Sequence, residues 1–184
     1  MTARLTIPIL RGARITLRPF TPDDAPTVQE MLAGPEIAST TLNISHPYPE
    51  GAAASWIESH AEAADLGMAL TWASERTEDS MLLGAIAVHL TPRHLRGEIG
   101  YWLGVPFWNQ GYTTEAAKLV VDYAFATLGL HRVQATCLPT NIGSSRVMEK
   151  AGLTFEGILR DYYQKRGVFT DVAMYARIAR QDTE

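Results

Sequence analysis

The chain has 184 residues, of which 46% are hydrophobic and 20% charged, and its net charge is −4. This composition is typical of a folded globular protein and excludes a disordered or membrane-spanning chain. The length predicts one domain covering residues 1–184. Because acidic residues are in excess and no basic run occurs, we expect neither nucleic acid nor a membrane as a partner.

The N-terminal segment and the cysteine and histidine content exclude further classes. Residues 1–19 carry separated arginines and no continuous apolar run, so we expect no signal peptide and a cytoplasmic protein. The single cysteine, Cys137, excludes an internal disulfide and a cysteine-based zinc cluster. The five histidines have no metal-ligand spacing, so we expect no metal.

The first half of the chain predicts one strand, two helices and three strands. Alternation in residues 14–20 indicates a strand, and Thr21, followed by a proline and two acidic residues, indicates the start of a short helix. The alanine-rich run 50–65 predicts a second helix that ends at Gly67. Strand-like runs beginning at Met68, Met81 and Arg96, separated by short polar turns, predict an antiparallel meander.

The second half predicts a helix, a strand, a short helix and two closing strands. The two helices are expected over 113–128, before Gly129, and over 144–151, before Gly152. The strands are expected over 131–138, 153–160 and 171–178. The resulting order βααβββαβαββ is neither regular βαβ alternation nor all-β. It predicts an α+β (mixed α/β) fold in which helices cover a mixed sheet.

One segment, EIGYWLGVPFWNQGYTTEAAKLVVDYAF at 98–125, runs from a strand through a glycine-bearing turn into a strong helix. Free N–H groups and the helix dipole favour an anion at such a helix start, and glycine allows close backbone approach. The residues at this start are Asn109, Gln110, Gly111, Tyr112, Thr113 and Thr114. An ordinary strand–loop–helix connection has the same pattern. Neither the dinucleotide-binding GxGxxG pattern nor the Walker A pattern is present.

The same segment resembles the cofactor motif of the GNAT acetyltransferases, Gln/Arg-x-x-Gly-x-Gly/Ala, and particularly the RimJ/RimL-like branch, which acetylates N-terminal amines of ribosomal proteins. The matching runs are GYW at 100–102, WNQGYT at 108–113 and TEA at 114–116. Trp108 replaces Gln/Arg, as is common in the branch, and Thr113 replaces the final Gly/Ala. Further runs, HPYPEGAAASWIE, NIGSSRVMEKAGL and EGILRDYY, extend the resemblance over almost the whole chain.

The resemblance implies a GNAT-like fold, with a central, mostly antiparallel sheet that splays between the strand bearing Leu103 and its neighbour at 131–138. It also implies acetyl-CoA as the cofactor, with CoA as the product. Backbone groups of Leu103 and Val105 would bind the pantetheine arm, and the loop at 109–114 would bind the pyrophosphate. Asn141 would hydrogen-bond the arm, or could instead cap the following helix.

The implied reaction is direct attack of a neutral amine on the thioester, so positioning and polarisation supply much of the rate. Glu98 is the candidate base, alone or through water, and the alternative is an exposed charge at a strand end. Many GNAT enzymes have a tyrosine acid where this chain has Met148. Ser144 could donate a hydrogen bond to the departing thiolate or be the N-cap of the short helix. Cys137 has a Cys-x-x-x-Asn spacing seen in part of the branch, or belongs to the core.

The acceptor implied by the resemblance is a protein N-terminal α-amine. A small amine, such as an antibiotic, an aminoacyl nucleotide or a polyamine, is the alternative, and a non-catalytic acetyl-CoA-binding regulator is a third interpretation. Acceptor specificity is expected in variable loops at 40–49 and 162–170. Tyr162, Tyr163 and Phe169 could line an acceptor groove or pack the closing hairpin. We also consider a homodimer, because exposed sheet edges favour pairing.

Overall fold

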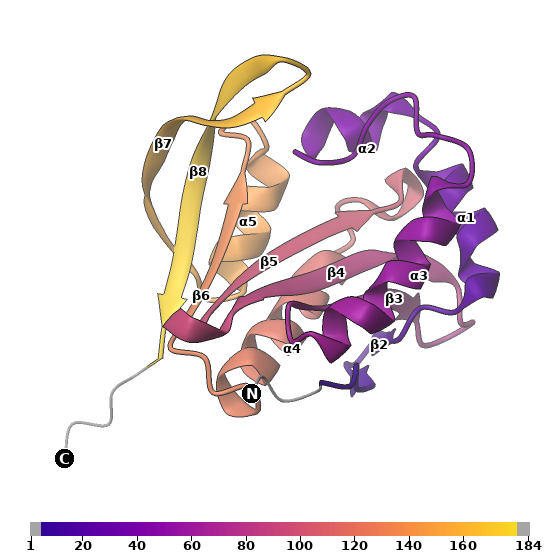
Figure 1. Cartoon of the computed structure of the whole chain (residues 1–184), viewed down its shortest axis with the longest axis horizontal. Helices are drawn as coiled ribbons and strands as arrows, with labels where there is room; N and C mark the ends of the chain where they lie inside the picture. Colours follow the sequence, from indigo (N-terminus) through magenta and orange to yellow (C-terminus); the bar gives the residue numbers. More distant parts are fainter. Residues whose placement is uncertain (1–4, 180–184) are drawn as a thin grey trace.

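The computed structural model describes residues 5–179 (Figure 1). Arg4 therefore lies outside the described residues, as do both ends of the expected domain 1–184. The strands are β1 (Leu10–Arg11), β2 (Ile15–Arg18), β3 (Ala69–Arg76), β4 (Leu82–Thr91), β5 (Arg96–Leu103), β6 (Arg132–Cys137), β7 (Thr154–Lys165) and β8 (Val168–Ile178). The helices are α1 (Ala25–Met31), α2 (Pro35–Thr40), α3 (Ala52–Asp65), α4 (Tyr112–Ala126) and α5 (Ile142–Lys150), with 3-10 turns η1 (Pro22–Asp24), η2 (Pro92–His94) and η3 (Val105–Phe107).

The strands form one sheet in the order β1-β2-β3-β4-β5-β6-β8-β7, in which β5 and β6 are parallel and the other neighbours antiparallel. The α+β class and the mostly antiparallel mixed sheet are thus confirmed. The predicted element order was incomplete, because it lacks β1 and α2. Both are short: β1 has two residues, and α2 has six, of which Ile37 and Ala38 are buried. Neither is long enough to show a clear period.

Helix α4 follows from its sequence. Its buried face consists of Tyr112, Ala116, Ala117, Val120, Val121 and Ala124, at helical spacing. The chain enters the helix through Gly111, with φ +84°, and leaves it before Gly129, with φ +63°. Glycine adopts such left-handed angles without a steric penalty, so these two residues fix where α4 begins and ends.

The two faces of the sheet have separate cores. One cluster includes Ile99 of β5 together with the apolar residues of α4, and the other includes Trp102 of β5 with residues of α1 and α3. Successive side chains of a strand point to opposite faces. Glu98 and Gly100 therefore share the α1/α3 face with Trp102, and Tyr101 shares the α4/α5 face with Ile99.

Strands β5 and β6 are paired over only three register positions, Arg96 with Arg132, Gly97 with Val133 and Glu98 with Gln134. Beyond them the two strands diverge into a V, which confirms the expected splay (Figure 1). Helix α2 and the tip of the β7–β8 hairpin lie above the open end of the V. Glu98 thus stands at the base of the opening.

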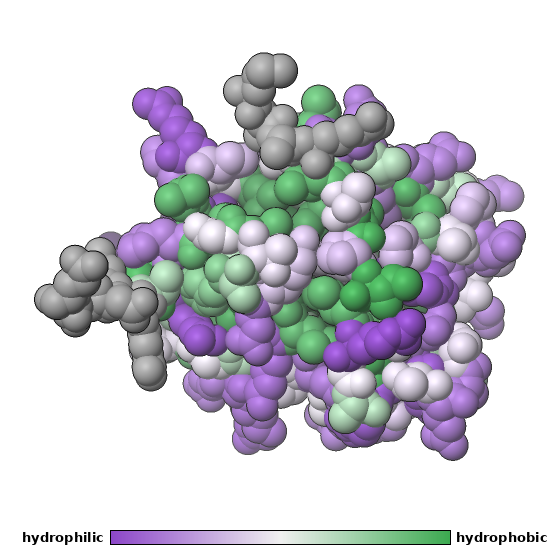
Figure 2. All heavy atoms as spheres, turned by 90° about the horizontal axis from the view of Figure 1, so that it is seen from below, coloured by the Kyte–Doolittle hydropathy of each residue, from purple (hydrophilic) through white to green (hydrophobic). Residues whose placement is uncertain are grey.

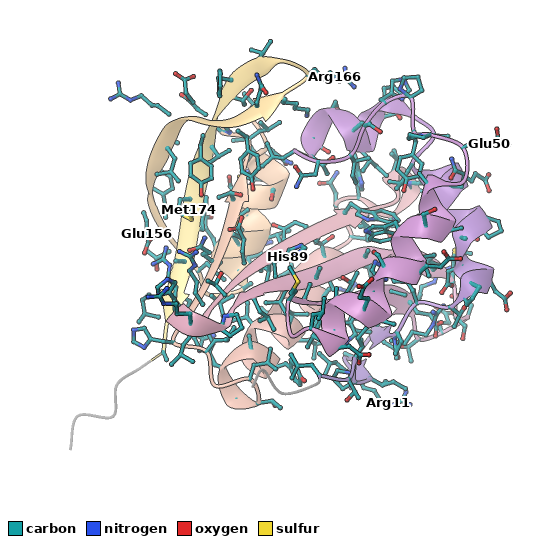
Figure 3. All side chains as sticks on the ribbon, viewed as in Figure 1. Arg11, Glu50, His89, Glu156, Arg166 and Met174 are labelled. Carbon is teal, nitrogen blue, oxygen red and sulfur yellow. The ribbon has the colours of Figure 1, made fainter. Side chains whose placement is uncertain are left out.

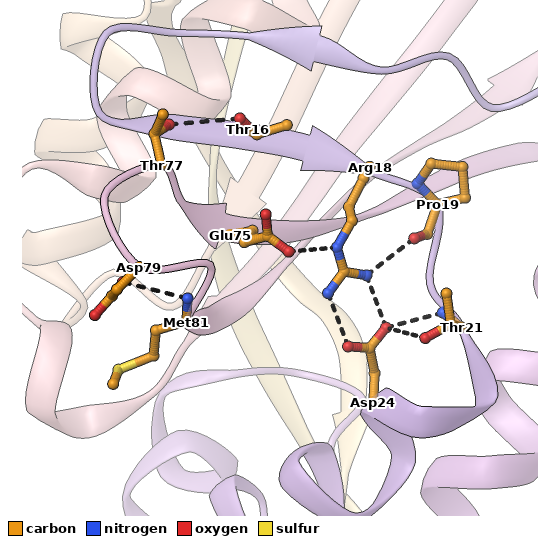
Figure 4. Close-up of polar contacts among 9 residues, drawn as sticks. All are labelled: Thr16, Arg18, Pro19, Thr21, Asp24, Glu75, Thr77, Asp79 and Met81. Carbon is orange, nitrogen blue, oxygen red and sulfur yellow. Dashed lines mark hydrogen bonds and ion pairs between the residues drawn. The ribbon is translucent and has the colours of Figure 1, made fainter.

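A charged network ties β2 to η1 and β3 (Figure 4). The Arg18 guanidinium donates to both carboxylate oxygens of Asp24, at 2.8 and 2.9 Å, and to Glu75 at 2.6 Å. Burial alone would raise the pKa of Asp24, but the hydrogen bonds from Arg18 and from the Thr21 N–H outweigh it and hold that pKa below its ordinary value. The entrance to α1 is therefore fixed against the sheet.

The remaining surface adds few constraints on function. On the face seen from below, away from the open end of the V, hydrophobic side chains reach the surface between hydrophilic ones (Figure 2). Within residues 5–179 no helix has the length and apolar character required to cross a membrane. In the same range no three His, Cys, Asp or Glu side chains are grouped so that they could hold a metal ion.

Candidate functional site

The start of α4 presents free backbone donors. Glu115 N–H is bonded to the Gly111 carbonyl at 3.2 Å, so the N–H groups of Tyr112, Thr113 and Thr114 precede the helical hydrogen-bond ladder. Gly111 is exposed and has no side chain to block approach. Asn109 also has a positive φ, +61°, and with Gln110 completes an exposed turn. Loop 109–114 therefore has the geometry of an anion site.

A cavity of about 320 Å³ lies against this helix start. Its lining residues are Arg14, Gly111, Thr114, Glu115, Lys118 and Lys150. Arg14 donates to the Gln110 carbonyl at 3.0 Å and to the Glu115 carboxylate at 3.2 Å, and its guanidinium lies 4.9 Å from the centre of the Tyr112 ring. Three cations against one carboxylate favour a polyanion such as the pyrophosphate of acetyl-CoA. Arg14 comes from outside the recognised motif, and the sequence analysis did not identify it.

The end of β5 turns backbone groups into the split. Gly104 N–H donates to the Leu83 carbonyl of β4 at 2.8 Å, so the alternation of the ladder directs the N–H and C=O of Leu103 away from β4. The Leu103 carbonyl accepts a hydrogen bond of 2.7 Å from the Trp108 indole, so of its two backbone groups the N–H is the one that could bind the implied pantetheine arm. Val105 is exposed at the start of η3.

Asn141 is the N-cap of α5. Its Oδ1 accepts from the Ser144 N–H at 3.0 Å, and its Nδ2 donates to the Thr40 carbonyl at 3.0 Å. The alternative in which Ser144 caps this helix is therefore wrong. The structure has Asn141 as the cap, which was the alternative role considered for that residue. Nδ2 carries two N–H groups, so a second hydrogen bond to a cofactor arm is compatible with the one to Thr40.

Ser144 instead faces a tyrosine of β5. Its Oγ lies 2.8 Å from the Tyr101 hydroxyl. Burial raises the pKa of the Tyr101 phenol, although the hydrogen bond to Ser144 acts against that rise, so Tyr101 stays a proton donor. The GYW run was recognised as a family signature, but nothing local indicated that Tyr101 would meet Ser144. Met148, at the position of the usual tyrosine acid, is 1% exposed and belongs to the core.

Cys137 lies at the buried end of β6. Its Sγ is 3.5 Å from the Ser145 hydroxyl. Burial raises the pKa of the thiol, against the opposing hydrogen bonds from Ser145 and Ser144. A thiol with a raised pKa is a poor nucleophile at neutral pH. The core interpretation of Cys137 fits this position.

Glu98 is partly buried at the base of the V. Its carboxylate accepts hydrogen bonds from Gln134 at 2.9 Å and from Thr136 at 3.2 Å, both on β6. The alternative of an exposed charge at a strand end is therefore wrong. Both donors are neutral side chains. His89, the register partner of Glu98 on β4, is exposed on the same face (Figure 3).

The α1/α3 face next to Glu98 is open. A side chain at Gly100 would meet nothing within 4 Å. Tyr163 approaches from the hairpin, and its pKa is raised by burial and then by the negative charge of Glu98. The expected loop 162–170 is not a loop but the tip of the β7–β8 hairpin, because both strands extend further than their apolar alternation indicated. Tyr162 and Phe169 are exposed there. Residues 41–49 are irregular, as expected, after Thr40 ends α2.

The two chemical groups thus lie on opposite faces of the sheet. Glu98 faces the α1/α3 side, whereas Tyr101 and Ser144 lie on the α4/α5 side, the side of the α4 cavity. Strands β5 and β6 diverge between the two sides. An amine could approach Glu98 from one face while a thioester carried by a polyanion reaches Ser144 from the other.

Comparison with known proteins identifies the family to which this chain belongs. The model of the acetyltransferase (GNAT) domain matches residues 14–154. A relative in Bacillus subtilis (strain 168), the uncharacterized N-acetyltransferase YoaA, is 31% identical over 170 residues, which cover 92% of this chain and 96% of the relative.

Two solved structures have the same fold. RimL, the ribosomal L7/L12 α-N-protein acetyltransferase, in complex with coenzyme A, has a TM-score of 0.83 at 19% identity and covers 93% of this chain and 98% of its own. The microcin C7 self-immunity acetyltransferase MccE, in complex with acetyl-CoA and AMP, has a TM-score of 0.81 at 20% identity and covers 91% and 94%. The chain belongs to the GNAT family, and it is an N-acetyltransferase that uses acetyl-CoA as its acetyl donor.

Proposed function

We propose that the acceptor is the N-terminal α-amine of a protein, and that Glu98 takes its proton. One observation carries the proposal: Glu98 is held only by neutral donors and lies beside the open space over Gly100. Near pH 7.4 about a quarter of an α-amine is neutral, against roughly a thousandth of a lysine amine, given pKa values of about 7.7–8.0 and 10.4. A single carboxylate base is therefore sufficient to assist an α-amine, whereas it gives little assistance to a lysine amine.

The remaining roles follow from the two faces. Loop 109–114 holds the pyrophosphate, with Arg14 and the two lysines of the cavity supplying positive charge. Leu103 and Val105 offer backbone groups to the pantetheine arm, and Asn141 donates to it from Nδ2. Acetyl-CoA supplies the thioester that the amine attacks. Ser144, backed by the phenol of Tyr101, donates a hydrogen bond to the departing sulfur.

The test measures free-thiol release with three acceptor classes. These are peptides with a free N-terminus and no lysine, N-terminally blocked peptides that contain one lysine, and small amines such as spermidine. We expect kcat/KM to be highest for the free N-terminal peptides, and mass spectrometry to locate the acetyl group on the α-amine. Highest kcat/KM with the blocked lysine peptides would refute the proposal.

A small-amine acceptor is the second candidate, and the fold similarity to the microcin C7 self-immunity acetyltransferase favours it. The same panel separates the two, because a small-amine enzyme should turn over spermidine or an aminoacyl nucleotide and leave every peptide unmodified. A regulator without turnover is no longer a candidate, since the chain belongs to a family of transferases. The homodimer stays a prediction. Strand β7 lies at the edge of the sheet and could pair with a second copy, and analytical ultracentrifugation would measure the oligomeric state.

A further inference from the structure

The tip of the β7–β8 hairpin is attached to the end of α2 by one side chain. Lys165 Nζ donates to three backbone carbonyls there, Ala38 at 2.9 Å, Ser39 at 3.1 Å and Thr41 at 2.6 Å. These residues are 124 to 127 positions apart in the sequence. Figure 3 places the neighbouring Arg166 at the tip of the hairpin, on the side toward α2. All three donors of the ammonium are used, so the contact is specific to a protonated lysine.

The same end of α2 is attached from a second side. Asn141 Nδ2 donates to the Thr40 carbonyl, so residues 38–41 link the hairpin to the N-terminus of α5. The hairpin, the end of α2 and the start of α5 surround the open end of the V (Figure 1). Residues 38–41 therefore contact both the hairpin and the start of α5 at the open end of the V.

Lys165 and Tyr163 share the inner face of the hairpin. They are two residues apart on β7, paired with Val168 and Thr170 of β8, and both are partly buried while Gln164 between them is exposed. Alternation along β8 from Met174, the partner of Thr136, to Thr170, the partner of Tyr163, puts Tyr163 on the sheet face that bears Glu98, and the negative charge of Glu98 adds to the rise in the tyrosine pKa. A hairpin whose tip is fixed by Lys165 therefore also fixes the position of Tyr163 on that face.

We propose that Lys165 is a positioning residue for the amine acceptor: by attaching the hairpin to the end of α2 it fixes one side of the acceptor opening and holds Tyr163 over the sheet face that bears Glu98. The inference deepens the proposed function, since it assumes that the acceptor approaches Glu98 from the α1/α3 face, but it does not depend on the acceptor being a peptide. Without the ammonium the three carbonyls return to water and the hairpin tip is free to move. The acceptor then loses one wall of its site, while loop 109–114 keeps its contacts.

The experiment compares Lys165→Met, which keeps the length of the side chain but has no donor, with Lys165→Arg and with the matched control Arg166→Met. Arg166 is an exposed cation in the same hairpin. For Lys165→Met we expect at least about a tenfold rise in acceptor KM, a change in kcat of less than about threefold and an unchanged Kd for acetyl-CoA. Lys165→Arg should recover much of the KM, and Arg166→Met should match the wild type.

Hydrogen–deuterium exchange provides a readout that needs no acceptor. In Lys165→Met the amides of residues 37–41 and of the hairpin tip should exchange faster, and those of α4 should not change. Unchanged exchange at both segments would overturn the attachment, and faster exchange with an unchanged KM would reduce Lys165 to a structural role and overturn the positioning. If the wild type acetylates small amines and no peptide, the proposed acceptor fails, and the same KM comparison with the best small amine still decides the role of Lys165.

Discussion

The carboxylate of Glu98 accepts a hydrogen bond of 2.9 Å from the side-chain amide of Gln134, its register partner at the last paired position of β5 and β6. The bond joins the two strands at the point where they separate. It fixes the candidate base at the base of the opening, because both residues project from backbone that is still paired. A base on a loop would lack this constraint.

Glu98→Gln should lower kcat/KM by about ten- to a hundredfold below neutral pH, with a smaller loss at high pH where the amine is already neutral. The substitution keeps the shape of the side chain and removes the proton acceptor. The pH dependence of kcat/KM with a free N-terminal peptide checks this expectation. His89→Gln is the matched control, because β4 lies on the far side of β5 from the split, and its profile should follow the wild type. If His89→Gln altered the pH profile of kcat/KM and Glu98→Gln did not, His89 and not Glu98 would be the general base.

Gly111→Val should weaken acetyl-CoA binding at least about tenfold, which corresponds to about 1.4 kcal/mol. The added side chain would stand at the anion site and 3.2 Å from the Arg14 guanidinium, and the φ of +84° would add about 1–3 kcal/mol of backbone strain. Calorimetry gives the Kd, and urea unfolding gives the stability.

The control for Gly111→Val is Gly129→Val at the other end of α4, where φ is also positive and a side chain would meet nothing within 4 Å. It should lower stability by a similar amount and leave the Kd unchanged. If both variants bind acetyl-CoA like the wild type, the phosphates lie elsewhere and loop 109–114 must be withdrawn as their site.

These residues also show which parts of the molecule the sequence could predict. Gly111 and Gly129 carry local information, since a left-handed angle is a property of one residue, and the ends of α4 were predicted to within about two positions. The attachment of Lys165 to the end of α2 was not predictable, because it depends on how far the β7–β8 hairpin extends over a segment more than a hundred residues earlier. The contact of Arg14 with Gln110 was missed because it joins positions 96 residues apart that no shared motif connects. Ser144 was considered as a cap because serine is a good N-cap residue and the short helix was expected to begin there, whereas it begins at Ile142.

Asn141→Asp should separate the cap of α5 from the contact with the cofactor. An aspartate still accepts the Ser144 N–H and so keeps the cap, but it lacks the donor that now reaches Thr40 and is proposed to reach the pantetheine arm. We expect stability within about 1 kcal/mol of the wild type and a loss of acetyl-CoA affinity of about three- to tenfold. Asn141→Ala should lose the cap as well, at about 1 kcal/mol. Equal affinity for all three proteins would exclude Asn141 from the cofactor site.

Ser144→Ala should lower kcat about three- to tenfold, and Tyr101→Phe should lower it by a similar factor, because the phenol and the serine hydroxyl are hydrogen-bonded at 2.8 Å and the phenol also donates to the Ser144 carbonyl at 3.2 Å. The double variant should lose little more than either single one, since the two groups act as one unit. Cys137→Ala serves as the control and should keep most activity, because direct transfer needs no thiol. Isolation of an enzyme acetylated on Cys137 would contradict this assignment.

The last prediction concerns stability and pH through His60 of α3. The ring is 7% exposed, packs at 4.5 Å from the Trp56 ring and 5.4 Å from the Phe20 ring, and burial lowers its pKa to about 4. Its ordinary value is 6.5. Between those two pH values the unfolded chain binds the proton and the folded chain does not, so the free energy of unfolding falls as the pH drops, by up to roughly 3 kcal/mol.

His60→Leu should remove most of this slope between pH 6.5 and 4 and leave stability near neutral pH within about 1 kcal/mol, since neither ring nitrogen has a hydrogen-bond partner within the described residues. Urea unfolding at several pH values measures the slope, with His94→Leu at an exposed position as the control. Equal slopes for His60→Leu and the wild type would mean that the folded protein accommodates a charged imidazole at this site.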